Sequence, residues 1–401
     1  MKALVFGPGP DPAAPALLAS TPMAMGAITD PPLRGPDWAV LRTRLCGICG
    51  SDVKQVMLDG DGDSPMTAFI SFPQVLGHEV VATIDQAGPA LVDAGFAVGQ
   101  RVVLNPWLSC GPRGIDPPCP ACQAGDLSLC WSFFDGALST GIHTGTSSDA
   151  TGGFAELLPA HRDMLIPVPD AVPDEVAVLA DPFAVSLHAV TRNPPPEGGR
   201  VVVYGAGALG TCAVAVIRAL YPTADVAAVA LWPAQAALAA RLGAQVFEPE
   251  PRQALVEQLA EWSGGVLRRP WEGLPVTHPG AIDVVYDTVG SASTVEVGLR
   301  VLRSRGTHVQ LGVGKVERCE WTPWYFKELR LVGSNAFGVE TVDGCARHGI
   351  AHYLDMAEAG RVDLEGLLTH TFPLDGWHDA FVALADQEHS GAIKVAFDLR
   401  T

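Results

Sequence analysis

The pattern of apolar and polar positions divides the chain into zones that differ in the length and spacing of their apolar runs. Up to about residue 180, short apolar runs are interrupted by Gly, Pro and Asp, which is typical of an irregular domain rich in β-strands. From residue 194 onward, strand-like runs alternate with alanine-rich helical segments, and strands are expected within residues 201–204, 226–231, 281–290, 307–313 and 329–338. This alternation predicts an α/β fold with a parallel, doubly wound sheet. The tail ends in AIKVAFDL, a further strand.

Composition narrows the class of protein. The chain has 401 residues, 48% of them hydrophobic, which is enough for two domains. Its 44 acidic and 26 basic residues give a net charge of −18, and such a surface repels phosphate backbones, so no nucleic acid is expected as a partner.

The ends and the apolar runs predict no membrane segment. The amino terminus, MKALVFGPG, has no apolar signal-peptide core, and glycines interrupt the most apolar run, residues 201–217. We therefore expect a cytoplasmic protein without a membrane partner. In that compartment its nine cysteines are expected to be metal ligands or buried thiols rather than disulfides.

A glycine loop follows the strand at residue 204. Gly205, Gly207 and Gly210 spell G-x-G-x-x-G between a β-branched strand and an alanine-rich helix. The first glycine allows a tight turn, the second lets the backbone approach a pyrophosphate, and the third allows close packing of helix on strand. In this setting the motif predicts a dinucleotide site rather than a plain glycine turn, and the site includes the intervening residues Ala206, Ala208 and Leu209.

The choice of dinucleotide stays open. A dinucleotide site normally has an acid at the end of its second strand to hold the adenosine ribose. Here that strand ends in Ala230-Leu231-Trp232, and Asp225 lies at its other end. No Arg or Lys takes the position to bind a 2′-phosphate, so the cofactor is NAD or NADP.

Four cysteines lie close together in the sequence. The stretch CGPRGIDPPCPACQAGDLSLC places four thiols within 21 residues, at Cys110, Cys119, Cys122 and Cys130. Four thiolates suit a closed tetrahedral zinc site that stabilises a loop. The alternative is four incidental cysteines in a loop rich in Gly and Pro, but exposed free thiols are a liability. The spacing therefore predicts a structural zinc ion.

A second cysteine pair has three possible meanings. Cys46 and Cys49 in LRTRLCGICGSDVK could be a redox dithiol, half of a zinc clamp, or two unrelated thiols. His78 follows 29 residues after Cys49 with Glu79 directly behind it, and the later ADPF carries Asp181. One thiolate, one imidazole and carboxylates form a normal ligand set for a catalytic zinc ion. A lone histidine or an Asp-Pro usually has no such role. The interpretation therefore depends on finding these residues together with the glycine loop and the four-cysteine lobe.

In these motifs the chain resembles the zinc-dependent medium-chain dehydrogenase/reductase family. CGICGSD, GHE, the four-cysteine lobe, ADPF, GAGALG and AIKVAFDL occur in the family's order. The sequences of these motifs are most similar to those of the polyol and threonine dehydrogenase branch. The resemblance implies a GroES-like catalytic domain in residues 1–185 and 339–401, with the zinc lobe at about 105–135, and a Rossmann domain in residues 186–338.

The family pattern also implies roles for the metal residues. The cysteine directly before G-S-D is the ligand, so Cys49 binds zinc, whereas Cys46 packs in a strand. His78 becomes the second ligand and Asp181 the third. Glu79 is an exchangeable fourth ligand or lies in the outer shell.

The remaining site residues follow from the same pattern, with three departures. Asp52 orients His78, and Ser51 passes the substrate proton outward. Lys54 stands where many relatives have a relay histidine, and it serves either as a relay or as a solvated contact of the cofactor. Asp181 stands where this branch often has Glu. Cys110 is separated from the next cysteine by eight residues rather than the usual two.

The resemblance implies an enzyme. We expect a zinc-dependent oxidoreductase that moves a hydride between a secondary alcohol (a polyol, sugar or amino alcohol) and NAD(P)+, and that reduces the carbonyl in reverse. The nicotinamide is expected near Gly312 and Val313, with one catalytic and one structural zinc ion, in a homodimer or homotetramer. The alternative is a non-catalytic NAD(P)-binding protein on the same fold, which the missing ribose acid would suit.

Overall fold

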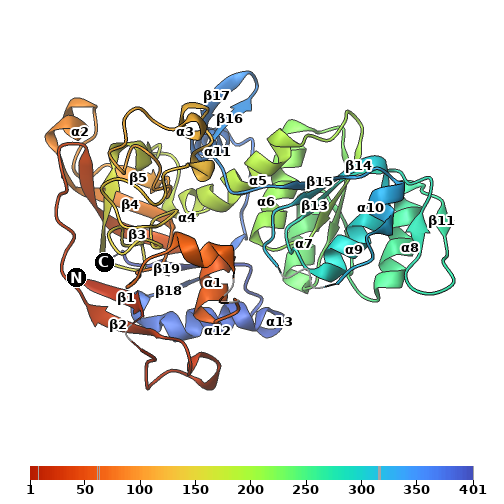
Figure 1. The fold of residues 1–401 in the computed structure, drawn as a ribbon, viewed down its shortest axis with the longest axis horizontal. Helices are drawn as coiled ribbons and strands as arrows, with labels where there is room; N and C mark the ends of the chain where they lie inside the picture. Colours follow the sequence, from red (N-terminus) through yellow and green to blue (C-terminus); the bar gives the residue numbers. More distant parts are fainter. Residues whose placement is uncertain (8, 61, 63, 315–317, 401) are drawn as a thin grey trace. The chain divides into compact units, whose positions relative to one another are not determined.

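The computed structural model describes residues 1–7, 9–60, 62, 64–314 and 318–400, and its ribbon is drawn in Figure 1. These residues form two compact units. The first unit contains residues 1–181, 350–358 and 368–401, and the second contains residues 182–349 and 359–367. Both ends of the chain therefore belong to the first unit, and the second unit is inserted between them.

The division of the units differs in detail from the expected boundaries. Residues 339–349, expected with the first unit, belong to the second. They form a hairpin of β16 (Val339–Val342) and β17 (Cys345–His348). Buried Glu340 of this hairpin pairs with His188 of α5 (Ala180–Arg192), with 2.5 Å between Oε1 and Nδ1. This buried pair ties the hairpin to the second unit.

The first unit is built on a seven-stranded sheet. The strand order is β18-β19-β3-β4-β5-β7, and β6 also pairs with β3. All pairs are antiparallel except that between β18 and β19. The strands are β3 (Trp38–Gly47), β4 (Glu79–Ala87), β5 (Arg101–Leu104), β6 (Leu157–His161), β7 (Leu165–Pro167), β18 (Leu368–Phe372) and β19 (Lys394–Asp398). The closing AIKVAFDL is thus a strand of the first unit, beside β3.

The core of the first unit follows from side-chain alternation. Val80, Ala82 and Ile84 of β4 are buried on one face, because every second side chain of a strand points the same way. Helix α12 (Trp377–Ala385) covers this region with Trp377 and Phe381. A separate antiparallel pair, β1 (Lys2–Phe6) and β2 (Met23–Ala27), adds residues from the amino terminus.

The other helices of the first unit have between four and ten residues. They are α1 (Gly50–Val56), α2 (Pro89–Asp93), α3 (Pro120–Gln123), α4 (Asp174–Ala177), α11 (Gly349–Glu358) and α13 (Gln387–Ser390). Within the described part of the chain, no helix combines the length and apolar character that crossing a membrane requires.

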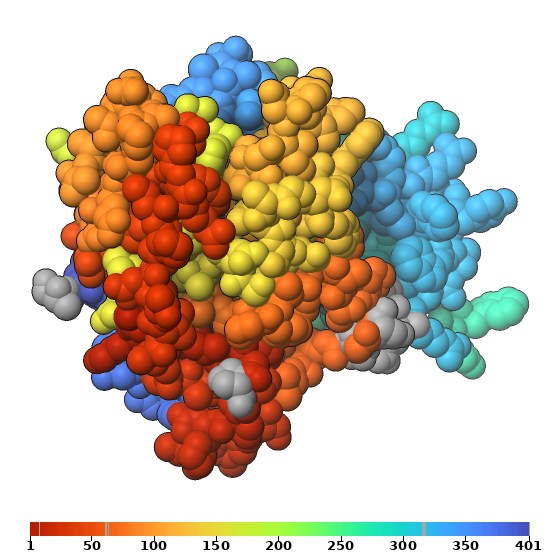
Figure 2. Space-filling view, turned by 60° about the vertical axis from the view of Figure 1, so that its left-hand side comes forward, coloured from red at the N-terminus to blue at the C-terminus, as the bar shows by residue number. Residues whose placement is uncertain are grey.

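The irregular segment between β5 and β6 covers one face of the first unit. In the space-filling view it forms a continuous gold to yellow surface (Figure 2). Arg113 holds this segment from within, being 1% exposed. Its guanidinium donates hydrogen bonds to the carbonyls of Leu108, Asp135, Leu138, Ser139 and Gly141 at 2.7–3.1 Å. A single side chain thus ties the start of this segment to residues 135–141.

The second unit contains a parallel sheet of six strands. The order is β10-β9-β8-β13-β14-β15, so the chain starts in the middle, builds one side and then crosses to the other. This is the strand order of a Rossmann sheet, as the alternating pattern predicts. The strands are β8 (Arg200–Tyr204), β9 (Asp225–Val229), β10 (Gln245–Phe247), β13 (Ile282–Asp287), β14 (Leu302–Gln310) and β15 (Arg330–Gly333).

Helices cover both faces of this sheet, because its central strands β8, β9 and β13 are mostly apolar and buried. Val202 and Tyr204 of β8 pack with α8 (Arg252–Ser263) and α9 (Ala292–Val301). Val201 and Val203 are equally buried on the opposite face, where α6 (Ala208–Leu220) packs beside α7 (Pro233–Arg241). The smaller elements are α10 (Thr322–Phe326) and a hairpin of β11 (Leu267–Arg268) and β12 (Val276–Thr277).

We predict that Arg113→Met strongly destabilises the first unit. The change leaves five carbonyls without their donor, three of them in fully buried hydrogen bonds, which should cost more than about 3 kcal/mol. Arg162→Met is the control, because Arg162 is 46% exposed and pairs with Asp37 at the surface, and an exposed pair contributes at most about 1 kcal/mol. Thermal unfolding measures both variants, and equal midpoints would contradict the anchoring role of Arg113.

Candidate metal centres and active site

The four cysteines of the irregular segment come together in space. Their Sγ atoms lie within 4.8 Å of one another, with 3.6 Å between Cys110 and Cys130 and 3.9 Å between Cys119 and Cys130. Four sulfurs bound to one zinc ion at about 2.3 Å are about 3.8 Å apart in a tetrahedron. The arrangement therefore fits a zinc ion, and it includes Cys110 despite the long spacing before Cys119.

The surroundings of these thiols favour their charged form in part. Backbone N–H groups point at sulfur, from Cys119 to Cys110 at 3.3 Å and from Trp131 to Cys119 at 3.4 Å. Burial alone would raise the pKa of Cys119, but such donors outweigh it and lower the pKa to about 6. Burial raises the pKa of Cys130 to about 11. Four thiolates at this spacing repel one another, and a divalent cation would remove that repulsion.

The second cysteine motif forms the junction between β3 and α1. The strand ends at Gly47, and Cys49 is the residue that caps the amino end of α1. The Asp52 carboxylate accepts the backbone N–H of Cys49 at 2.9 Å, which is a capping box that satisfies a free donor of the helix end. The cap fixes Cys49 where the loop leaves the sheet.

Cys49 meets two residues from the start of β4. One ligand atom each of Cys49, His78 and Glu79 lie within 4.8 Å of one another. Asp52 lies beside them, with 3.8 Å between its Oδ1 and Nδ1 of His78, which is a charge contact rather than a hydrogen bond. The structure therefore brings together Cys49, His78 and Glu79, which are far apart in the sequence.

Asp181 lies near this group but not within it. It stands in the first turn of α5 and is buried. Its Oδ2 has no hydrogen-bond partner among the described residues, and burial raises the pKa of the carboxyl to about 7. An unpartnered buried carboxylate is costly, and a cation nearby would offset that cost.

Glu79 has a partner that the motif did not indicate. Its carboxylate forms an ion pair with the buried Lys394 of β19, whose Nζ also donates to the Ile48 carbonyl at 2.9 Å. Besides Glu79, the buried carboxylates of Asp52 and Asp181 and the Cys49 thiol act electrostatically on this one buried lysine. The excess of negative groups fits a bound divalent cation, for which Cys49 and His78 offer soft and intermediate ligands.

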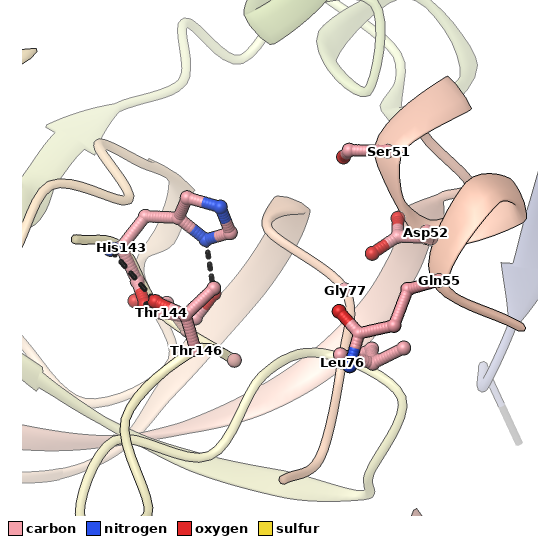
Figure 3. A pocket seen from close by; sticks show the side chains of 9 residues that line it. Ser51, Asp52, Gln55, Leu76, Gly77, His143, Thr144 and Thr146 are labelled. Atoms are coloured by element: carbon pink, nitrogen blue, oxygen red, sulfur yellow. Dashed lines mark hydrogen bonds between the residues drawn. The ribbon is translucent and has the colours of Figure 1, made fainter. Parts of the chain in front are cut away.

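A pocket opens beside this group. It contains about 250 Å³ of space, partly open to solvent. One wall carries Ser51, Asp52 and Gln55 of α1, and the other carries residues 143–146 (Figure 3). Lys54, the predicted relay or cofactor contact, lies in α1 but is not one of the residues that line the pocket.

His143 is a pocket residue that the sequence analysis missed. Its ring lies against that of His78, with 4.5 Å between the centroids. It belongs to no motif, because it stands alone between Ile142 and Thr144 in the irregular segment. Only the folding of that segment over the pocket brings it to the site.

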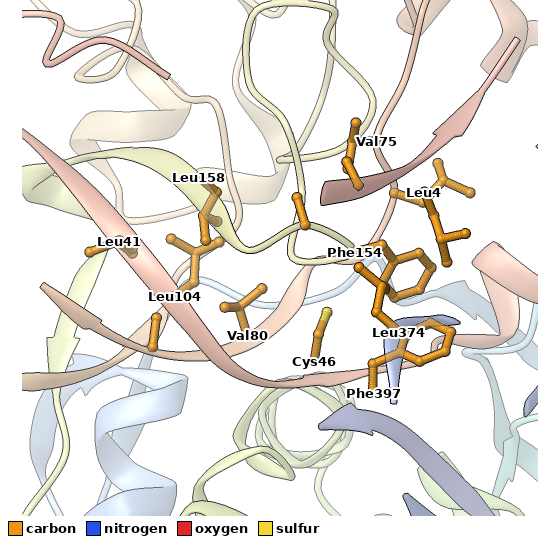
Figure 4. Close-up of a cluster of buried hydrophobic side chains, with 14 of the residues drawn as sticks. Leu4, Leu41, Cys46, Val75, Val80, Leu104, Phe154, Leu158, Leu374 and Phe397 are labelled. Atoms are coloured by element: carbon orange, nitrogen blue, oxygen red, sulfur yellow. The ribbon is translucent and has the colours of Figure 1, made fainter. Parts of the chain in front are cut away.

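Cys46 lies in a different environment from Cys49. Its side chain is fully buried in the apolar core beside Val80 and Phe397 (Figure 4), and in the sheet it stands opposite both residues. Burial raises the pKa of its thiol well above the ordinary value. The prediction that Cys46 packs in a strand is confirmed.

In the second unit, the glycine loop has the geometry its motif predicts. Gly205 has a φ of +92°, which only glycine adopts without strain. A Cβ at Gly210 would overlap the carbonyl of Gly205, whereas a Cβ at Gly207 would stand in open space at the amino end of α6. That open approach to the helix end fits a pyrophosphate.

The predicted nicotinamide turn lies on a neighbouring strand end. Gly312 follows β14, and a Cβ there would overlap the backbone of Thr288, which follows β13. Val313 is 77% exposed. The loops after β8, β13 and β14 thus share the carboxyl edge of the sheet, where the strand order reverses and ligands of such sheets bind.

The end of β9 carries no charged group. The strand runs from Asp225 to Val229, so Asp225 stands at the far end, as predicted. The next residue, Ala230, is buried and donates its N–H to the Phe247 carbonyl. The usual acid that holds the ribose is therefore replaced by a methyl group.

Comparison with known proteins decides the family. Residues 35–170 match the model of the alcohol dehydrogenase GroES-like domain, and residues 208–348 match that of the zinc-binding dehydrogenase domain. Together the two models match about two thirds of the chain. The chain belongs to the zinc-dependent medium-chain dehydrogenase/reductase family. It is an oxidoreductase that acts on alcohols with zinc and a nicotinamide cofactor.

Named relatives of this dehydrogenase cover almost its whole length. It is 29% identical over 380 residues to (R,R)-butanediol dehydrogenase of Saccharomyces cerevisiae. The matched region covers 90% of this chain and 92% of that protein. It is 28% identical over 350 residues to L-galactonate-5-dehydrogenase of Escherichia coli, covering 85% and 86%. The crystal structure of 2R,3R-butanediol dehydrogenase from Bacillus subtilis has a TM-score of 0.73 at 22% identity, covering 100% and 99%, and shares the fold.

We predict that the dehydrogenase does not tolerate Gly47→Ala. The new Cβ would overlap the Glu79 carboxylate, which cannot move aside without leaving Lys394. Overpacking of this kind costs about 1–3 kcal/mol. Gly50→Ala is the matched control, because its Cβ would meet nothing within 4 Å. Thermal unfolding should show a lower midpoint for the first variant alone, and a similar loss in both would argue against the Glu79 contact.

Proposed function

We propose that this dehydrogenase oxidises a small secondary alcohol that carries a further polar group, such as a diol, polyol, sugar or amino alcohol, and reduces the matching carbonyl in reverse. The observation that carries the proposal is the pocket with Ser51 on its wall beside the cluster of Cys49 and His78. The relatives named for butanediol, galactonate and xylulose support this substrate class. All three names denote compounds with more than one oxygen function.

In this proposal the residues of the first unit hold the metal and move the proton. Cys49 and His78 are ligands of the catalytic zinc, and Asp181 or Glu79 completes the set. When bound, zinc supplies a Lewis acid that makes the substrate hydroxyl more acidic. Ser51 accepts the hydroxyl proton and releases it outward, because it lies at the exposed start of α1. Asp52 keeps Cys49 and His78 in position.

The second unit holds the cofactor. Residues 205–210 receive the pyrophosphate at the amino end of α6, and Gly312 and Val313 border the nicotinamide, which supplies the hydride acceptor. The four cysteines hold a second zinc ion that stabilises the irregular segment. A homodimer or homotetramer in the cytoplasm stays a prediction.

A non-catalytic NAD(P)-binding protein is the alternative. Its support is the missing ribose acid after β9. The family and the metal ligands weigh against it, since binding alone needs no proton acceptor in a pocket. A screen of secondary alcohols and carbonyls with both cofactors, followed at the nicotinamide absorbance, separates the two. Zinc-dependent turnover of any substrate supports the enzyme, and none across diols, polyols, sugars and amino alcohols supports the alternative.

We predict about two zinc ions per chain, and different effects for the two cysteines of CGIC. Cys49→Ala removes a ligand, so the zinc content should fall to about one while the four-cysteine site stays filled and turnover collapses. Cys46→Ala removes a buried thiol and should cost on the order of 1 kcal/mol in stability, with zinc and turnover kept. Elemental analysis of protein purified without chelator measures both. The reverse pattern would refute the assignment, and equal zinc loss would indicate a paired clamp.

We further predict weak discrimination between NAD and NADP. Neither an acid nor a basic clamp follows β9, so nothing there repels or binds a 2′-phosphate. The two values of kcat/KM should differ by less than about tenfold, or ~1.4 kcal/mol. A larger preference for NAD would mean that another residue holds the ribose hydroxyls.

A further inference from the structure

His143 lies on the pocket wall opposite α1. In Figure 3 its ring points into the space between the two walls, with Ser51 and Asp52 on the far side. The ring contacts the His78 ring, with 4.5 Å between centroids, and lies nearly perpendicular to the Trp107 ring, with 6.0 Å between centroids. These contacts fix the plane of the imidazole.

Backbone contacts fix its rotation as well. Nδ1 lies 2.8 Å from the Thr144 carbonyl oxygen. The Thr144 N–H in turn donates to the Pro106 carbonyl at 2.8 Å. The Thr146 hydroxyl donates to the His143 carbonyl at 2.6 Å and accepts the His143 N–H at 3.1 Å. The loop is therefore preorganised around the ring.

The Thr144 contact decides which ring nitrogen carries the hydrogen. A carbonyl oxygen can only accept, so Nδ1 must be the donor, and in a neutral imidazole Nε2 is then an acceptor. Within the described residues no carboxylate pairs with this ring, so its contacts hold a single ring hydrogen, on Nδ1.

Nε2 has no hydrogen-bond partner within the described residues. The polar contacts of His143 are made by its backbone and Nδ1. The hydroxyl of Thr146 is already engaged with the His143 backbone. The pocket thus presents one preoriented acceptor that the protein itself leaves unused.

We propose that His143 is a specificity-determining residue that accepts a hydrogen bond, through Nε2, from a second hydroxyl of the substrate. This inference rests on the proposed function and narrows its substrate class to small diols and polyols whose second hydroxyl lies near the reacting carbon. The second hydroxyl is not consumed, so the same contact holds the hydroxyketone in the reverse reaction. A simple secondary alcohol of equal length leaves Nε2 without a partner.

The test compares 2,3-butanediol with 2-butanol in the zinc-loaded enzyme. His143→Phe keeps an aromatic ring against His78 and Trp107 but has no acceptor. The ratio of kcat/KM for the diol to that for the mono-alcohol should fall about tenfold or more, as a lost hydrogen bond to substrate implies. The loss should lie mainly in KM, because the contact is made in both the ground state and the transition state.

Three controls separate recognition from structure. His143→Gln restores an acceptor oxygen and should recover part of the ratio. His389→Phe makes the same substitution at an exposed histidine and should leave the ratio unchanged. Affinity for the diol without cofactor, measured by saturation-transfer NMR, should weaken in His143→Phe although no turnover occurs.

These experiments test the role of His143 separately from the proposed dehydrogenase activity. An unchanged ratio in His143→Phe, or an equal loss for both substrates, overturns the role of His143 while turnover by the wild-type enzyme still supports the dehydrogenase. Failure of the wild-type enzyme to turn over either alcohol, or any other in the substrate screen, overturns both proposals. A tenfold fall in the ratio with zinc content and 2-butanol turnover kept supports the specificity role.

Discussion

The buried ion pair between Lys394 and Glu79 is the interaction on which the metal-binding region depends. Lys394 opens the last strand, Glu79 opens β4, and the lysine also donates to Ile48 in the CGIC loop. Removing one partner of a buried pair typically costs about 3–5 kcal/mol because the other charge stays buried. The pair therefore fixes the loop that carries Cys49 to a strand more than 300 residues away, and it explains why Gly47 has no side chain.

The two candidate metal centres differ in how they are built. The four cysteines lie within one segment, so a short loop and α3 are enough to bring them to tetrahedral spacing. The group of Cys49, His78 and Glu79 depends on the pairing of β3 with β4 and on the cap of α1. A local site can be closed on all sides, whereas a site at strand ends borders a pocket. This difference suits a structural centre and a catalytic centre respectively.

The second unit shows how steric limits shape a cofactor site. Gly210 and Gly312 are glycines because the backbone of a neighbouring loop occupies the space of a Cβ. Gly207 is different, since nothing in the protein fills the space beside it. Packing therefore requires glycine at positions 210 and 312, whereas Gly207 leaves an opening that a ligand can use. At the end of β9 the usual acid is absent, and the buried Ala230 follows the strand instead.

The amino-acid sequence alone determined the parallel sheet, the glycine loop and the four-cysteine lobe, because each depends on residues close together in the chain. Resemblance to the family was needed to separate Cys49 from Cys46, whose spacing permits either role. Only the tertiary structure decided the partner of Glu79, the position of Asp181 outside the closest ligand group, the extent of each unit and the presence of His143 in the pocket. Those features arise from contacts between distant segments, which no local pattern of residues records.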